Sequence, residues 1–410
     1  MTTSAGADRL HGLDAVRGYA LLLGIVFHAT ASFLPGPQIW PVIDTHRSLT
    51  LAGVFYVSHI FRMTTFFLIA GFFAHMMVEK RGVAAFIRDR AKRIALPLVV
   101  GWPILFAAII AATVYGAYVA TGNLPKPPPP PAHPPLAAFP LAHLWFLYVL
   151  LLLYAATLTV RGAVVRMDRT GRLRAGVDSL VAGLVESPAA PLALALPAAL
   201  AFYASDPWLE WFGVAGPDSS LIPNLPAAVE YFTAFGFGWL LNRQPGLLNV
   251  MSRRWPLNLA LALAFTAVCL AMVGVAPLIA PARPGLQRLA YAAAYSLAMW
   301  TWTFAAIGMA LRFLSRPSPV RRYIADSSYW LYLVHLPLIL ALQAAVSQLD
   351  WPWEVKIAVI LSVAFPLMFA SYQLLVRHSF IGAILNGSRA PKPAKAPPVA
   401  RKALAQEVTR

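Results

Sequence analysis

Residues 13–28 read LDAVRGYALLLGIVFH, an apolar run with charges in its first turn and an imidazole at its end. About 20 such residues in a helix cross the roughly 30 Å of hydrocarbon in a bilayer. Ionisable groups inside an apolar span are costly, and they usually serve a function. This stretch therefore predicts a membrane-crossing helix whose polar residues belong to a site.

The composition extends this prediction to the whole chain. Of its 410 residues, 59% are hydrophobic and 12% are charged, whereas a soluble domain carries about 25% charged residues. A water-soluble fold of this length could not bury so much apolar surface. In a membrane protein the net charge of +17 marks the cytoplasmic side rather than a nucleic-acid partner. The single cysteine, Cys269, excludes an internal disulfide framework.

Apolar stretches recur along the chain and predict an all-α, polytopic membrane protein with about ten transmembrane helices. With both termini cytoplasmic, the great majority of the 33 Lys and Arg residues fall on the inner side. We expect a transmembrane domain over 1–380 and a basic, disordered cytoplasmic tail over 381–410. The expected spans are 17–34, 52–78, 96–121, 143–160, 189–205, 227–242, 257–280, 289–314, 328–348 and 355–377.

Arg17 and His28 are expected to share one face of the first span. At 100° per residue they lie about 20° apart around the helix axis and roughly 16 Å apart along it. Asp14 lies beside Arg17 on the neighbouring strip. An imidazole titrates near neutrality and can act as a general base. The competing interpretation is a histidine that only packs, with Arg17 as a topological anchor.

The second span and the segment after it add more basic groups. His59 and Arg62 lie three residues apart and so share a helix face. A guanidinium near mid-depth needs a carboxylate, a carbonyl or an anionic ligand. Arg90 and Arg93, in the inner segment RDRAKR at 88–93, can clamp phosphates as a pair. A basic cluster at this place can also serve only to set the topology.

Two later spans hold one ionisable residue each that we also consider. Glu230 opens the sixth span and is a candidate partner for Arg62 or His28. His335 lies in the ninth, where an isolated histidine more often packs than reacts. No nucleotide-binding loop, dinucleotide fingerprint or HExxH metal motif stands in a supporting context. We therefore expect no bound metal and no permanently bound cofactor.

Taken together, these residues resemble the acyltransferase 3 family of integral-membrane acyltransferases. Arg17 and His28 fill that family's pattern of Arg, ten residues and His, and Arg90 and Arg93 fill its Arg-x-x-Arg. The Asp-x-x-Arg start is most similar to the branch of periplasmic glucan succinyltransferases. Further blocks that look like the family are 59–63, 66–73, 143–147 and 329–337.

The chain departs from the family at one place. Ser-Gly is usual where this sequence has Ala70-Gly71, so a serine hydroxyl cannot be essential at that point. Gly71 would instead allow a close approach between helices.

The resemblance implies a membrane-bound O-acyltransferase in the inner (cytoplasmic) membrane, embedded in the lipid bilayer. It would move an acyl group, with succinyl as one candidate, from a cytoplasmic acyl-CoA to a hydroxyl of an extracytoplasmic glycan. The alternative is a transporter or flippase for an anionic lipid or sugar. The implied catalytic residues are His28 as general base or acyl carrier, Asp14, and Arg62 as oxyanion stabiliser, and the implied substrate-binding residues are Arg17, Arg90, Arg93, His59, Glu230 and His335.

Overall fold

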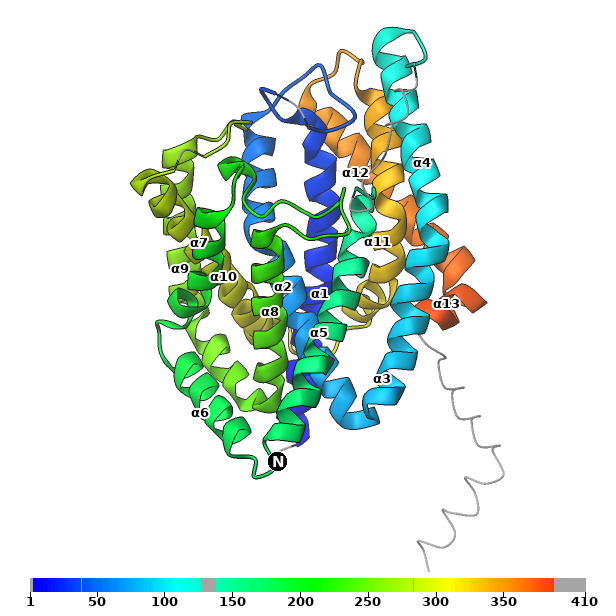
Figure 1. The fold of residues 1–410 in the computed structure, drawn as a ribbon. Helices are drawn as coiled ribbons and strands as arrows, with labels where there is room; N and C mark the ends of the chain where they lie inside the picture. The colour runs from blue at the N-terminus through cyan, green and yellow to red at the C-terminus, as the bar shows by residue number, and fades with distance from the viewer. Residues whose placement is uncertain (1–2, 38, 127–137, 283, 387–410) are drawn as a thin grey trace, which may run out of the picture.

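The computed structural model describes residues 3–37, 39–126, 138–282 and 284–386, and every named element in them is helical (Figure 1). This confirms the predicted all-α class. The helices that build the bundle are α1 (Thr3–Thr30), α2 (Leu49–Arg81), α3 (Val83–Arg90), α4 (Leu96–Thr121), α5 (Trp145–Met167), α6 (Arg172–Glu186), α7 (Ala190–Ala204), α8 (Leu225–Arg243), α9 (Leu248–Val273), α10 (Leu286–Phe313), α11 (Pro319–Val346), α12 (Trp353–Ser371) and α13 (Phe380–Leu385).

The number of spans comes out slightly below the expected ten. Within the described ranges, eight helical segments are long and apolar enough to cross a membrane, or nine if α6 and α7 form one span bent by 106°. The two expected spans that do not meet this criterion on their own are α7 and α8. α7 has only 15 residues, and α8 contains Glu230 and ends with Asn242 and Arg243, which lowers its apolar character.

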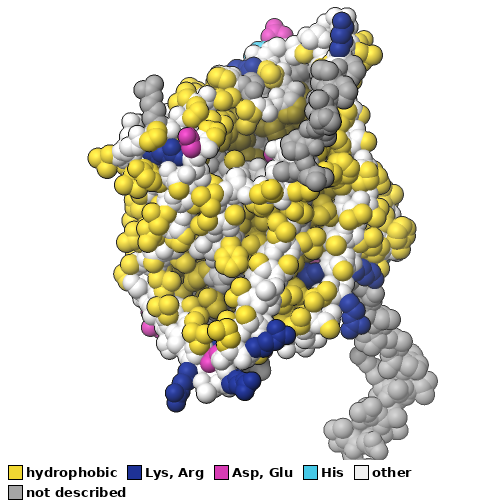
Figure 2. Space-filling model, viewed as in Figure 1, with side chains coloured by type: hydrophobic (Ala, Val, Ile, Leu, Met, Phe, Trp, Pro, Cys, Tyr) yellow, Lys and Arg dark blue, Asp and Glu magenta, His cyan; other side chains and the backbone are white. Residues whose placement is uncertain are grey.

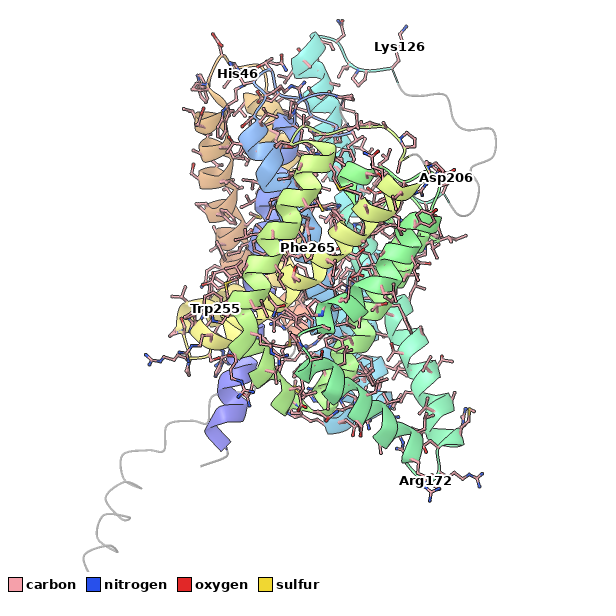
Figure 3. All side chains as sticks on the ribbon, turned by 90° about the vertical axis from the view of Figure 1, so that its left-hand side faces the viewer. His46, Lys126, Arg172, Asp206, Trp255 and Phe265 are labelled. Carbon is pink, nitrogen blue, oxygen red and sulfur yellow. The ribbon has the colours of Figure 1, made fainter. Side chains whose placement is uncertain are left out.

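Along the helix axes, the bundle has an apolar middle zone between two ends. Figure 2 shows a broad band of hydrophobic side chains around the middle of the bundle. The start of α1, α3 and α6 lie at one end, which we call the basic end (Figure 1). His46 and Lys126 lie at the opposite end, which we call the far end, whereas Arg172 lies at the basic end (Figure 3). That the basic end is cytoplasmic stays a prediction.

α1 lies inside the bundle and packs against α2, α10, α11 and α12. α2 and α8 approach so closely that only glycine fits at their crossing. A Cβ on Gly71 would lie 1.9 Å from the carbonyl oxygen of Phe235, and one on Gly238 would lie 1.9 Å from that of Leu68. Small residues allow such backbone contact in membrane proteins. The expected close approach at Gly71 is therefore present.

A continuous helical segment over Val83–Thr121 joins the basic end to the far end. It contains a π-helical turn, η2 (Ala91–Ala95), between α3 and α4. One extra residue in a turn changes the direction of the side chains, and such turns are frequent at functional sites. Arg93 lies within this turn, so its direction differs from the one a regular helix would give.

The first residues of the expected tail, 381–386, pack into the bundle. α13 covers Phe380–Leu385 and so overlaps the start of the range assigned to the tail, 381–410. Leu385 is buried in the core, and Asn386 contributes to the wall of the main cavity. The rest of the expected tail, 387–410, lies outside the described residues.

Candidate active site

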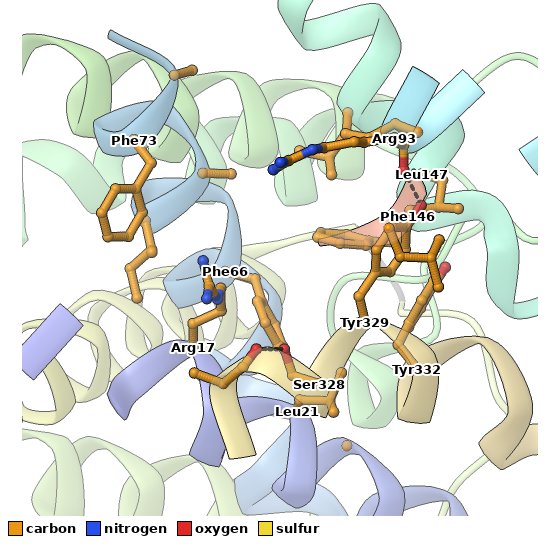
Figure 4. A pocket seen from close by; sticks show the side chains of 18 of the residues that line it. Arg17, Leu21, Phe66, Phe73, Arg93, Phe146, Leu147, Ser328, Tyr329 and Tyr332 are labelled. Carbon is orange, nitrogen blue, oxygen red and sulfur yellow. Dashed lines mark hydrogen bonds between the residues drawn. The ribbon is translucent and has the colours of Figure 1, made fainter. Parts of the chain in front are cut away.

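A cavity of about 620 Å³ connects the basic end to the interior of the bundle (Figure 4). Its walls come mainly from α1, α2, α5 and α11, with aromatic side chains along much of its length. Cations gather near the basic end and imidazoles gather deeper, beside one buried guanidinium. The cationic group at the entrance is Arg17, Lys80, Arg81, Arg90 and Arg93, and the deep group is His28, Arg62, His143 and His335.

Arg17 stands at the entrance. Its Nη2 lies 3.3 Å from Oδ1 of Asp14, and both side chains are about 40% exposed. In Figure 4 the guanidinium groups of Arg17 and Arg93 extend toward the same space from different helices. Asp14 is not part of the cavity wall, and 14 residues of helix place it roughly 20 Å along the axis from His28. The structure therefore gives Asp14 a contact with Arg17 and none with the imidazole.

Arg90 and Arg93 are held by a carboxylate between them. Asp89 accepts from Nη2 of Arg90 at 2.7 Å and from Nε of Arg93 at 3.2 Å. The guanidinium of Arg90 also lies over the Tyr154 ring, 5.8 Å from its centre. Nη2 of Arg93 donates to the carbonyl oxygen of Asn386 at 3.0 Å. Both arginines keep a fixed geometry at the cavity wall, as recognition of a phosphate requires.

His28 forms the deep end together with two other histidines. Its ring centroid lies 5.2 Å from that of His335, which lies 5.3 Å from that of His143. Nδ1 of His335 lies 2.6 Å from the carbonyl oxygen of Tyr332, and Nε2 of His143 lies 2.9 Å from that of Leu333. A carbonyl only accepts, so these nitrogens carry their protons. Among the described residues, Nδ1 of His28 has no hydrogen-bond partner.

Arg62 brings a permanent charge next to His28. It is 7% exposed, and its guanidinium lies 4.1 Å from the centre of the Phe27 ring. Such a cation–π contact stabilises the charge in part. Gly24 provides the space, because a Cβ there would lie 3.0 Å from Nη1 of Arg62. No carboxylate in the described part of the chain lies within ion-pair distance of Arg62.

Besides Asp14, two expected site residues do not reach the cavity wall. His59 stacks on the rings of Phe27 and Phe55, with centroids 5.4 Å and 6.0 Å away. Glu230 is fully buried beside the Thr64 hydroxyl and the Trp300 indole. It therefore forms no pair with Arg62 or His28.

Sequence reasoning missed two residues that the fold brings to the site. His143 stands in a block that signalled the family resemblance, but nothing in its neighbours placed it beside His335. Asp89 stands between Arg88 and Arg90, where it looks like one charge in a basic run. Among the described residues no three His, Cys, Asp or Glu side chains are arranged to hold a metal ion.

The fold and the cavity define a multi-pass membrane protein with an internal site, and comparison with known proteins identifies its family. Residues 10–371 match the model of the acyltransferase 3 family, described as an acyltransferase domain. This match covers most of the chain, and the protein belongs to this family.

Curated relatives share part of this sequence. The chain is 30% identical over 181 residues to glucans biosynthesis protein C of Salmonella paratyphi B, which covers 44% of this chain and 46% of the relative. It is 29% identical over 180 residues to the protein of the same name in Salmonella heidelberg, with 43% and 46% covered. The chain thus spans about half the length of the curated relatives it matches. No solved structure matches it.

Proposed function

We propose that this protein is a membrane-bound O-acyltransferase that moves an acyl group from a cytoplasmic acyl-CoA to a hydroxyl of an extracytoplasmic glycan. The observation that carries the proposal is the single cavity that both Arg93 and His28 line. In the inner membrane, with the basic end and both termini in the cytoplasm, this cavity would open toward the donor. Membership of the acyltransferase 3 family supports the reaction class, and the name of the relatives, glucans biosynthesis protein C, supports a glucan as acceptor.

The entrance of the cavity suits the polyanionic part of coenzyme A. Arg90 and Arg93 are preorganised by Asp89, and Arg17 faces Arg93 across the opening (Figure 4). Charge-assisted hydrogen bonds to phosphate are among the strongest that side chains make. A thioester at the end of the long pantetheine arm would then extend along the aromatic walls toward His28.

The deep end suits acyl transfer to a hydroxyl. Nδ1 of His28 has no hydrogen-bond partner among the described residues, so it is free to accept a proton from the acceptor. The hydroxyl oxygen then bonds to the thioester carbonyl, and the negative charge that develops on the carbonyl oxygen lies near Arg62. As the C–O ester bond is completed, the C–S bond breaks and the leaving thiolate takes the proton from the imidazolium.

Arg62 has a second use in the proposed reaction. Its guanidinium has no protein counter-ion within the described ranges, and it lies next to His28 in the cavity wall. An acyl group that ends in a carboxylate, such as succinyl, would supply the missing anion. Dependence of the rate on a terminal carboxylate in the acyl group would distinguish this role from oxyanion stabilisation.

The proposal is tested in membrane vesicles with acyl-labelled acyl-CoA and a glucan acceptor. The parent protein forms an acyl ester, His28→Ala loses it, and His378→Ala, which alters an exposed histidine outside the cavity, keeps it. General-base catalysis typically contributes about 10²–10⁴-fold, so a loss of this size is expected. Ester formation that His28→Ala leaves intact would refute the mechanism. Transport of a lipid or sugar without any covalent product would favour the transporter alternative.

A further inference from the structure

An indole stacks on His28 outside the cavity. Trp40 lies in the connection between α1 and α2, and its ring stacks on His28 with a centroid distance of 5.4 Å and an interplanar angle of 22°. Trp40 does not line the cavity, whereas His28 and its other neighbour His335 do. The imidazole therefore has the cavity on one side and Trp40 on the other.

A buried glutamine ties this indole to the helix that carries His28. Nε1 of Trp40 donates to Oε1 of Gln343 at 2.9 Å. Nε2 of Gln343 donates to the carbonyl oxygens of His28 at 2.9 Å and Ala29 at 3.1 Å. Gln343 is 1% exposed, so leaving any of these groups without a partner would cost free energy. The amide of Gln343 holds the indole and the end of α1 in register.

The connection that carries Trp40 is anchored farther along. Nζ of Lys356 donates to Oδ1 of Asp44 at 2.7 Å, and both side chains are almost fully buried. The backbone N–H of Asp44 donates to the carbonyl oxygen of Ser32 at 3.0 Å, and that of Thr45 donates to the carbonyl oxygen of Ser347 at 3.2 Å. These contacts are independent of Gln343. The segment is therefore fixed at a second place by contacts that do not involve Trp40.

We propose that Trp40 is the outer gate of the site: its indole seals His28 from the aqueous phase at the far end, and the acceptor hydroxyl reaches His28 by displacing it. This proposal rests on the proposed function for the identity of the acceptor, but the seal itself does not. Trp40 controls access to His28 and does not touch the reacting atoms, so it is a positioning residue and not a catalytic one.

The seal has a chemical purpose. Water that reached a thioester beside His28 would add to its carbonyl carbon, the C–S bond would break, and the products would be a free carboxylate and coenzyme A thiol. Closed active sites prevent such side reactions. An indole that yields only to the acceptor keeps the donor intact until transfer.

Thiol labelling tests the seal without any catalytic assay. Cys269 is the single cysteine and is buried, so Cys269→Ser provides a background into which His28→Cys is introduced. A charged, membrane-impermeant methanethiosulfonate is added to right-side-out vesicles. Labelling is expected to be slow with Trp40 present and at least about tenfold faster with Trp40→Ala, because the rate follows the open fraction. Trp40→Phe keeps an aromatic ring there and is expected to stay slow.

Labelling from the basic end in inside-out vesicles is the control for folding, and Trp40→Ala should leave it unchanged. If Trp40→Ala fails this control, Gln343→Leu is used in its place. This variant keeps the Trp40 indole but removes its hydrogen bond to Gln343, and it should also accelerate labelling from the far end. The gate would be overturned if labelling from the far end were equally fast in the protein with Trp40 and in the variant that passes the folding control.

A second readout separates this proposal from the proposed function. Without acceptor, Trp40→Ala should hydrolyse acyl-CoA faster than the parent, while Trp40→Phe should not. If the parent protein forms no acyl ester, the acyltransferase proposal is refuted. The thiol-labelling result then still tests the seal on its own. A parent that forms ester, with labelling and hydrolysis both insensitive to Trp40→Ala, refutes the gate alone.

Discussion

Replacing Gly24 by alanine tests whether the position of Arg62 sets the rate of acyl transfer. A Cβ at residue 24 would lie 3.0 Å from Nη1 of Arg62, 3.6 Å from its Cδ and 3.7 Å from its Cζ. The guanidinium must then yield by a few tenths of an ångström. Misplacement by about 1 Å can cost roughly 10²-fold in rate. We therefore expect a loss between about tenfold and 10²-fold.

The same substitution should not weaken the fold. Alanine is preferred over glycine inside a helix by about 1 kcal/mol, and the atom that must move is the far end of a flexible side chain. The assay measures ester formation at saturating donor and acceptor, together with thermal unfolding in the same nanodiscs. Gly53→Ala is the matched control, because a Cβ on this glycine of α2 meets nothing within 4 Å.

Two results would refute this reasoning. Gly24→Ala could turn over at the parental rate, which would show that the placement of the Arg62 guanidinium does not limit transfer. Alternatively, rate and thermal stability could fall together while Gly53→Ala changes neither. The loss would then reflect a damaged fold and not a displaced cation.

Three further substitutions probe the entrance, the helix crossing and the far end. Asp89→Asn should raise the KM for acyl-CoA about tenfold with little change in kcat, because its two arginine partners lose their alignment; a lower KM would show that removing negative charge outweighs positioning. Gly71→Ala should destabilise the protein by about 1–3 kcal/mol or more in thermal unfolding, since the backbone of α8 blocks the new methyl group, while Gly236→Ala, with nothing within 4 Å, should not; equal unfolding temperatures would contradict the crossing. Lys356→Met leaves Asp44 buried without its cation and should cost about 3–5 kcal/mol; an unchanged unfolding temperature would contradict that pair.

The part of the site that follows one helix could be predicted from the sequence. Arg17 and His28 are separated by a multiple of the helical repeat, so their common face follows from periodicity alone. The structure places both in the wall of one cavity. Arg93 was also expected near the surface of the membrane, although the π-helical turn that directs it has no signal that we recognised.

The pairing of residues from different helices could not be predicted. His59 and Arg62 share a helix face as expected, because both contact the Phe27 ring, but His59 lies one turn farther along α2 and does not line the cavity. Glu230 was considered as the partner of Arg62, but the packing of α8 against α2 buries it beside Thr64 and Trp300 instead. The contact of His143 with His335 likewise depends on how the turn before α5 lies against α11.

The central claim is that one cavity brings a donor bound at the basic end to His28. A cryo-EM structure of the protein in nanodiscs with a thioether analogue of acyl-CoA measures this most directly. We predict density for the phosphates beside Arg90 and Arg93 and the thioether sulfur beside His28. An analogue bound outside the cavity, or inside it with the sulfur directed away from His28, would contradict the account.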